Sequence, residues 1–108
     1  MFTKKADTGY RELLEGVEMK TLAHGEKTML AQFHLQKGAA IPMHGHIYEQ
    51  TGFMVSGKMR FTIGSERFEC DPGDTWCIPA DVEHGVEVLE DSVVVEVFSP
   101  VREDYLPT

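Results

Sequence analysis

Short segments in which apolar and polar residues alternate constrain this chain most strongly, because a period of two is the period of a half-buried strand. The clearest segment is 58–63, in which Met59, Phe61 and Ile63 share one face and the other three residues are polar. Gly64-Ser65 follows, and a glycine at the first position predicts a two-residue type II′ hairpin turn. A strand that returns from this turn is therefore expected next.

Glycine and proline separate further short apolar segments, as is typical of an all-β domain. The expected strands are 17–23, 28–36, 58–63, 66–70, 75–78, 84–89 and 93–98. Many short strands at near-regular spacing favour a sandwich or a barrel. Residues 10–15 are predicted to form at most one helical turn, and alternation in 75–78 places Trp76 in the core.

Charge and cysteine content limit the partners. The chain has 108 residues and a net charge of −8, from 10 Lys and Arg against 18 Asp and Glu. Such an acidic surface repels phosphate backbones, so no nucleic-acid partner is expected. No apolar run approaches the ~20 residues that span a bilayer, so no membrane partner is expected. The N-terminus lacks a signal-peptide core, and six residues separate Cys70 from Cys77, which is no metal or redox spacing. We therefore expect a cytoplasmic protein with two free, buried thiols.

Three histidines stand in a pattern that suits a metal ion. His44 and His46 are two apart and Gln50 has the same parity, so on a strand the three side chains would share a face. With His84, they offer three imidazoles and one side-chain oxygen, which suit a divalent transition metal with positions left for substrate. The spacing alone is equally consistent with His44 and His46 being ordinary polar residues on the surface ahead of a strand. His34 is expected to be structural.

The order and spacing of these residues resemble the two motifs of the cupin family. The first motif, over 38–57, is matched by Gly38, His44, Gly45, His46, Gln50 and Gly57, and the second, over 73–88, by Gly73, Pro79 and His84. The resemblance implies an all-β double-stranded β-helix, or jelly-roll barrel, in one domain over 1–108, and commonly a homodimer. It also implies a site for one divalent transition metal (Ni, Zn, Fe, Mn or Co), with the ligands His44, His46, Gln50 and His84.

Gln50 departs from the family pattern, which has Glu at this place. A neutral ligand leaves more positive charge on the metal, which favours Lewis-acid chemistry over redox chemistry. Glu49 is adjacent, and a shifted register in which Glu49 binds the metal is the alternative. The six-residue gap to Gly57 favours Gln50.

Glu96 is the only charge in the apolar run 93–98. A carboxylate in such a strand is costly unless it is paired, exposed or functional. By parity Glu96 and Phe98 share one face. The sequence pattern alone is equally consistent with an exposed Glu96 or with an ion pair between Glu96 and Arg102.

The tail 97–106 resembles that of the small pectin-degradation cupins, which open or linearise unsaturated uronate sugars from pectin and alginate. Their acid, Phe and Arg have the spacing of Glu96, Phe98 and Arg102, although the family acid is Asp. The resemblance implies Glu96 as catalytic acid and base, Arg102 as the catalytic clamp on the sugar carboxylate, and Phe98 as a substrate-binding wall. The substrate would be a small anionic sugar. A metal-dependent cupin dioxygenase and a non-catalytic small-molecule-binding cupin are the alternatives.

Overall fold

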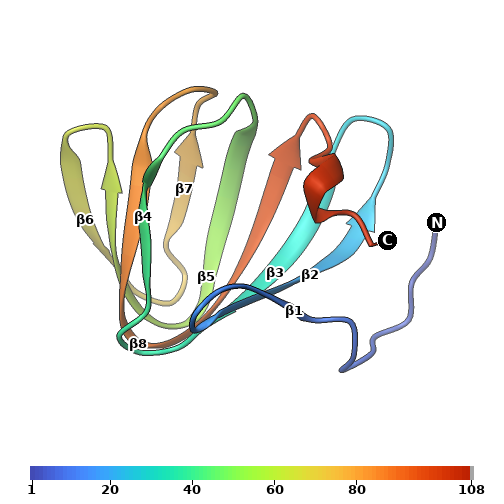
Figure 1. Cartoon of the computed structure of the whole chain (residues 1–108), viewed down its shortest axis with the longest axis horizontal. Helices are drawn as coiled ribbons and strands as arrows, with labels where there is room; N and C mark the ends of the chain where they lie inside the picture. Colours follow the sequence, from blue (N-terminus) through green and yellow to red (C-terminus); the bar gives the residue numbers. More distant parts are fainter. Residues whose placement is uncertain (108) are drawn as a thin grey trace.

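Two long strands, β5 (Glu49–Ile63) and β8 (His84–Ser99), organise the structure. The computed structural model describes residues 1–107, and in it β8 pairs with β5 in an antiparallel ladder from Glu49↔Ser99 to Ile63↔His84. In Figure 1, β8 runs from the left of the molecule along its lower edge to the right. Both long strands therefore run through the two halves of the barrel.

Shorter strands pair with the two halves of these long strands. They are β1 (Arg11–Leu14), β2 (Val17–His24), β3 (Met29–Leu35), β4 (Ala40–His44), β6 (Glu66–Cys70) and β7 (Thr75–Ile78). The C-terminal half of β8 pairs with β3, which continues through β2 to β1, and its N-terminal part pairs with β4. Likewise, β7 pairs with the first half of β5 and β6 with the second. The predicted all-β jelly-roll barrel is confirmed.

The long strands bend where their pairing is irregular. The register of β5 against β8 shifts three times between Met54 and Met59. Gly57 lies at this bend with a φ of +94°, and a Cβ there would collide with the carbonyl oxygen of Asp91. Both the backbone conformation and the close approach require glycine, which explains this position of the first motif.

Most local predictions hold, and the exceptions have physical reasons. The hairpin at Gly64-Ser65 is confirmed, since Ile63 pairs with Glu66 and only Gly64 of the two turn residues has a positive φ, of +60°. Two strands at 84–89 and 93–98 were expected, but β8 is one strand, because Glu90 and Ser92 stay in its ladders.

Two further expectations are wrong. Residues 11–14 form β1 rather than a helical turn, because pairing with β2 overrides a weak local helical signal. Cys70 and Cys77 are both free, but only Cys70 is buried. Alternation along β7 turns Trp76 inward, as expected, and therefore turns Cys77 outward.

The core fills the space between the inward faces of the strands. Its largest fully buried side chains are Phe61, Phe98, Met19, Met29, Met54, Met59, Ile78, Val17 and Val94. After β8, the chain forms a 3₁₀ turn, η1 (Glu103–Tyr105), which lies beside β2 and β3 in Figure 1. Within residues 1–107, no helix has the length and apolar character needed to cross a membrane.

Truncating a side chain should cost much more stability on the inward face of β5 than on its outward face. Met54 is fully buried, whereas the neighbouring Val55 is 47% exposed. We expect Met54→Ala to lower the free energy of unfolding by about 2–5 kcal/mol because it leaves a cavity, and Val55→Ala to change it by only about 0.5 kcal/mol. Urea unfolding of both variants measures the difference, and equal losses would contradict the assigned faces of β5.

Candidate metal centre

Three histidine side chains converge at one end of the barrel. One ring nitrogen from each of His44, His46 and His84 lies within 4.8 Å of the others. His44 ends β4 and is the cross-strand partner of His84, which begins β8. The parity of His44 and His46 would place them on one face only if they shared a strand, but β4 ends at His44 and His46 lies in the loop before β5. The loop is held by the N–H of Asp81, which donates to the carbonyl oxygen of His46 at 2.7 Å.

The backbone holds each of these rings in the same way. Nδ1 of His44 lies 2.9 Å from the carbonyl oxygen of Pro42. Nδ1 of His46 lies 3.0 Å from that of Tyr48, and Nδ1 of His84 lies 2.9 Å from that of Val82. A carbonyl oxygen only accepts, so this network assigns the ring proton to Nδ1 in all three. Each Nε2 is then left with a free lone pair, as a metal ligand requires.

Burial favours the neutral form of two of these rings. It lowers the pKa of His46, and the positive charge of Arg102 lowers it further. Burial also lowers the pKa of His84, although the hydrogen bond to Val82 opposes the shift. Neutral imidazole is the form that binds metal ions.

Gln50 completes the set with an oxygen that faces a nitrogen lone pair. Its Oε1 lies 2.8 Å from Nε2 of His46, and its Nε2 donates to the carboxyl group of Glu96. The donor contact with Glu96 sets the amide orientation, so two acceptors face each other across 2.8 Å. A cation between them removes the repulsion, and three imidazoles with one amide oxygen suit a divalent transition metal. The residues therefore fit such an ion.

Glu49 lies apart from this cluster. Its carboxyl group accepts a hydrogen bond from Sγ of the exposed Cys77 at 3.7 Å, on the outward face of β5 and β7. The geometry thus favours Gln50 over Glu49 as the fourth ligand.

Glu96 is buried next to the cluster. It is only 7% exposed, so an exposed side chain does not explain it. Burial raises the pKa of Glu96 to about 8, although Gln50, Trp76 and Arg102 all favour the charged form. Phe98 is buried two residues further along β8 on the same face, as its parity predicts.

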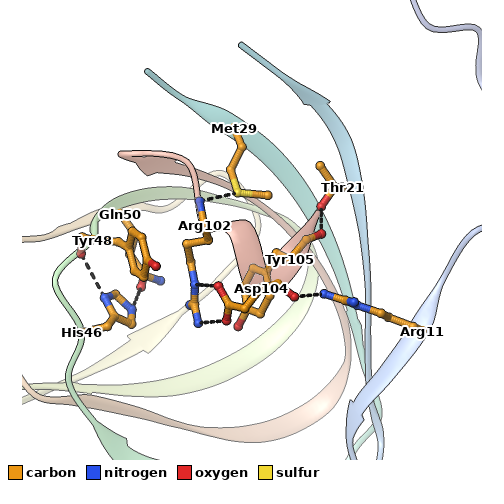
Figure 2. Close-up of polar contacts among 9 residues, drawn as sticks. All are labelled: Arg11, Thr21, Met29, His46, Tyr48, Gln50, Arg102, Asp104 and Tyr105. Atoms are coloured by element: carbon orange, nitrogen blue, oxygen red, sulfur yellow. Dashed lines mark hydrogen bonds and ion pairs between the residues drawn. The ribbon is translucent and has the colours of Figure 1, made fainter. Parts of the chain in front are cut away.

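Arg102 pairs with Asp104 rather than with Glu96. Its Nε and Nη2 donate to the two carboxylate oxygens at 3.3 and 2.9 Å (Figure 2). Its guanidinium carbon lies 3.8 Å from the ring centre of Tyr105, 5.0 Å from that of Tyr48 and 5.2 Å from that of Phe98. A planar cation held between aromatic rings is well ordered for binding a carboxylate.

The turn η1 that carries Asp104 is tied to the first strands. Arg11 donates to the carbonyl oxygen of Asp104, and Thr21 donates to that of Tyr105 (Figure 2). Burial by itself raises the pKa of Asp104, but the hydrogen bonds and charge of Arg102 outweigh it and lower the pKa. Sequence reasoning missed Tyr48, Asp104 and Tyr105, because no periodic pattern marks residues that meet only in the folded chain.

Several of these groups border one cavity of about 370 Å³, which is within the range of small-molecule sites. Its polar lining includes His44, Gln50, His84, Glu96, Arg102 and Asp104, and most of the remaining wall is apolar. The cavity therefore brings metal-ligating groups, a buried carboxyl group and a cation together around a space for a small molecule. His34 lies elsewhere, stacked on Tyr10 at 4.4 Å, in agreement with the expected structural role.

Known proteins share this fold and sequence. Residues 31–99 match the Cupin domain family. The pectin degradation protein KdgF of Dickeya dadantii (strain 3937) is 31% identical over 102 residues, covering 93% of each chain. The structure of KdgF from Halomonas sp. superposes with a TM-score of 0.88 at 30% identity, covering 93% of both chains. An RmlC-like cupin from Shewanella frigidimarina NCIMB 400 superposes with a TM-score of 0.91 at 24% identity, covering 97% of this chain and 95% of that one.

The histidine cluster predicts a metal content that depends on His84 and not on His34. We expect the untagged protein, loaded with Zn²⁺ or Ni²⁺ and dialysed, to retain about one ion per chain. His84→Ala should weaken affinity by at least about tenfold, because it removes one ligand, and His34→Ala should leave it unchanged. Elemental analysis with titration measures both. Equal metal content in the two variants would contradict the assignment of His84.

Proposed function

This chain belongs to the cupin family, and on that premise we propose that it is a metal-dependent enzyme that opens or linearises unsaturated uronate sugars from pectin or alginate. The observation that carries the proposal is the composition of one cavity, where Gln50 and two members of the three-histidine cluster, His44 and His84, lie beside the buried Glu96 and the cation Arg102. The similarity to KdgF, a pectin degradation protein, over 93% of both chains supports a role in pectin degradation.

The proposed metal ligands are His44, His46, Gln50 and His84. A divalent transition metal held there (Ni, Zn, Fe, Mn or Co) would supply a Lewis acid that polarises an oxygen of the sugar. Because all four donors are neutral, they leave the positive charge of the ion undiminished. We infer from this that the reaction is a proton transfer rather than a redox step.

Glu96 is the proposed proton carrier. When the ring of an unsaturated uronate opens, the hydroxyl at the anomeric carbon loses its proton, and the bond from that carbon to the ring oxygen breaks. The electron pair released to the ring oxygen forms an enolate with the adjacent double bond, and a proton returned to carbon gives the ketone. Glu96 lies on the cavity wall without an ion-pair partner among residues 1–107, so it is available to accept and return that proton.

Arg102 is the proposed partner of the sugar carboxylate, and Phe98 forms part of the wall behind it. The guanidinium already binds a carboxylate in two-point fashion, that of Asp104. We infer that the substrate carboxylate takes the place of the Asp104 carboxylate when the sugar binds. Asp104 would thereby select for molecules that carry a carboxylate of their own.

Three further expectations stay predictions. They are the homodimeric active form that the cupin resemblance implies, the single domain over 1–108, and the cytoplasmic location expected from the N-terminus and the cysteines.

Replacing the Glu96 carboxyl by an amide tests the proposed proton carrier. We expect Glu96→Gln to lower turnover of an unsaturated uronate by at least about 10²-fold, the scale of general acid–base catalysis, and to retain the metal. The matched control is Glu49→Gln, the same substitution on the outward face of the same sheet, which should change neither turnover nor metal content. Ring opening is followed by loss of the absorbance of the conjugated double bond.

Each other outcome of this assay counts against the proposal. Unchanged turnover in Glu96→Gln removes Glu96 from the mechanism, and loss of metal in Glu49→Gln reinstates Glu49 as the ligand. If the metal-loaded protein converts no uronate but consumes oxygen with another substrate, it is a dioxygenase. Binding of uronate without turnover would identify a binding module.

If the substrate carboxylate replaces that of Asp104 at Arg102, substitutions of Asp104 and of Arg102 should change KM in opposite directions. Asp104→Asn removes the competing charge, so KM for the uronate should fall by about threefold, as expected for a partly exposed ion pair. Arg102→Lys keeps the charge but loses the two-point geometry, so KM should rise. Steady-state kinetics of both variants measure this, and a rise of KM in Asp104→Asn would show that Asp104 supports Arg102 rather than competing at it.

A further inference from the structure

The only tryptophan of the chain, Trp76, lies one strand away from the proposed proton carrier Glu96, on the other side of β5. Gly52 on β5 pairs with Trp76 on β7 on one side and with Glu96 on β8 on the other. A Cβ on Gly52 would collide with Cε2, Cζ2 and Nε1 of the Trp76 indole. The indole therefore covers Gly52, with Nε1 among the atoms that lie closest to this position, and Gly52 stands between Trp76 and Glu96 in the sheet.

The indole N–H has no partner of its own. Trp76 is 8% exposed, and among residues 1–107 its Nε1 is the buried side-chain polar atom without a hydrogen bond. A buried donor left unpaired is destabilising, and such groups in native proteins usually mark a partner or a role. The indole N–H is therefore a buried donor that lacks an acceptor.

The acceptor beside it is the carboxyl group of Glu96. One oxygen of this group already accepts from Gln50, which leaves acceptor capacity on the other. Trp76 also acts on the pKa of Glu96, where it favours the charged form against the effect of burial. Both side chains face inward from the two strands that flank Gly52, and no hydrogen bond joins them in this structure.

We propose that Trp76 is a positioning residue whose indole N–H donates to the free oxygen of the Glu96 carboxyl group in the metal-loaded protein. Trp76 lies outside the lining of the cavity formed by residues 1–107, so it acts through Glu96. With both oxygens held, the carboxyl group has a fixed orientation, and so has the Gln50 amide that it contacts. This inference rests on the proposed function of Glu96.

The first test is spectroscopic and needs no substrate. With one tryptophan, the zinc-loaded, ¹⁵N-labelled protein has one indole N–H resonance. We expect it to be downfield and slow to exchange with solvent. Glu96→Met, which removes the acceptor at similar volume, should move it upfield and accelerate exchange, and Glu49→Gln should leave both unchanged. An indole resonance that is unaffected by Glu96→Met overturns the proposal.

The second test separates positioning from packing. Trp76→Phe keeps an aromatic ring without the N–H, and Gly52→Ala displaces the indole while it keeps the tryptophan. We expect both to lower kcat about tenfold, the worth of one hydrogen bond to a charged group, with KM within about twofold and metal content unchanged. Val88→Ala, a core truncation away from the cavity, should lower stability without this loss of kcat.

The two tests also distinguish this inference from the proposed function. If Trp76→Phe turns over uronate at the wild-type rate, the positioning role fails while the proposed function stands. If the wild-type protein converts no uronate, the proposed function fails. The contact between Trp76 and Glu96 then has no catalytic role, whatever the indole resonance shows.

Discussion

The site depends on one contact between two acceptors. Nε2 of His46 and Oε1 of Gln50 face each other at 2.8 Å, because the backbone carbonyl of Tyr48 holds the proton of His46 on the other nitrogen and Glu96 holds the amide group of Gln50. Two lone pairs at this distance repel each other, and a cation bound to both atoms removes the repulsion. The backbone carbonyl of Tyr48 and the Glu96 carboxyl group maintain this arrangement, and Trp76 is the proposed support of Glu96.

β8 connects the parts of the site. It begins at His84 beside the other histidines, carries Glu96 and Phe98 inward at its far end, and leads into Arg102 and the turn η1. A single strand that continues through both halves of the barrel thus sets the separation between the proposed metal ligands and Arg102. The net charge of −8 opposes an anionic sugar over the whole surface, so Arg102 and the proposed metal must attract it locally.

Much of this was predictable from the sequence, because it rests on local patterns. The alternation in 58–63, the turn at Gly64-Ser65 and the shared face of Glu96 and Phe98 follow from a period of two, and the spacing of the histidines carried the resemblance to cupins. The remaining features depend on contacts between distant segments. The continuity of β8 is set by its partners, and the strand at 11–14 by β2.

The least predictable feature is the pairing of Arg102 with Asp104, since it depends on a 3₁₀ turn that Arg11 and Thr21 hold against the barrel. The same holds for Trp76, whose apolar character explains its burial but not where its N–H points.

Anomalous diffraction from crystals of the metal-loaded protein tests the central claim most directly. The account predicts one strong peak at the absorption edge of the metal, about 2.0–2.2 Å from Nε2 of the three histidines and from Oε1 of Gln50, with Glu96 outside the coordination sphere. A peak bound by Glu49 or Glu96 in place of Gln50, or no peak among the histidines, would contradict it.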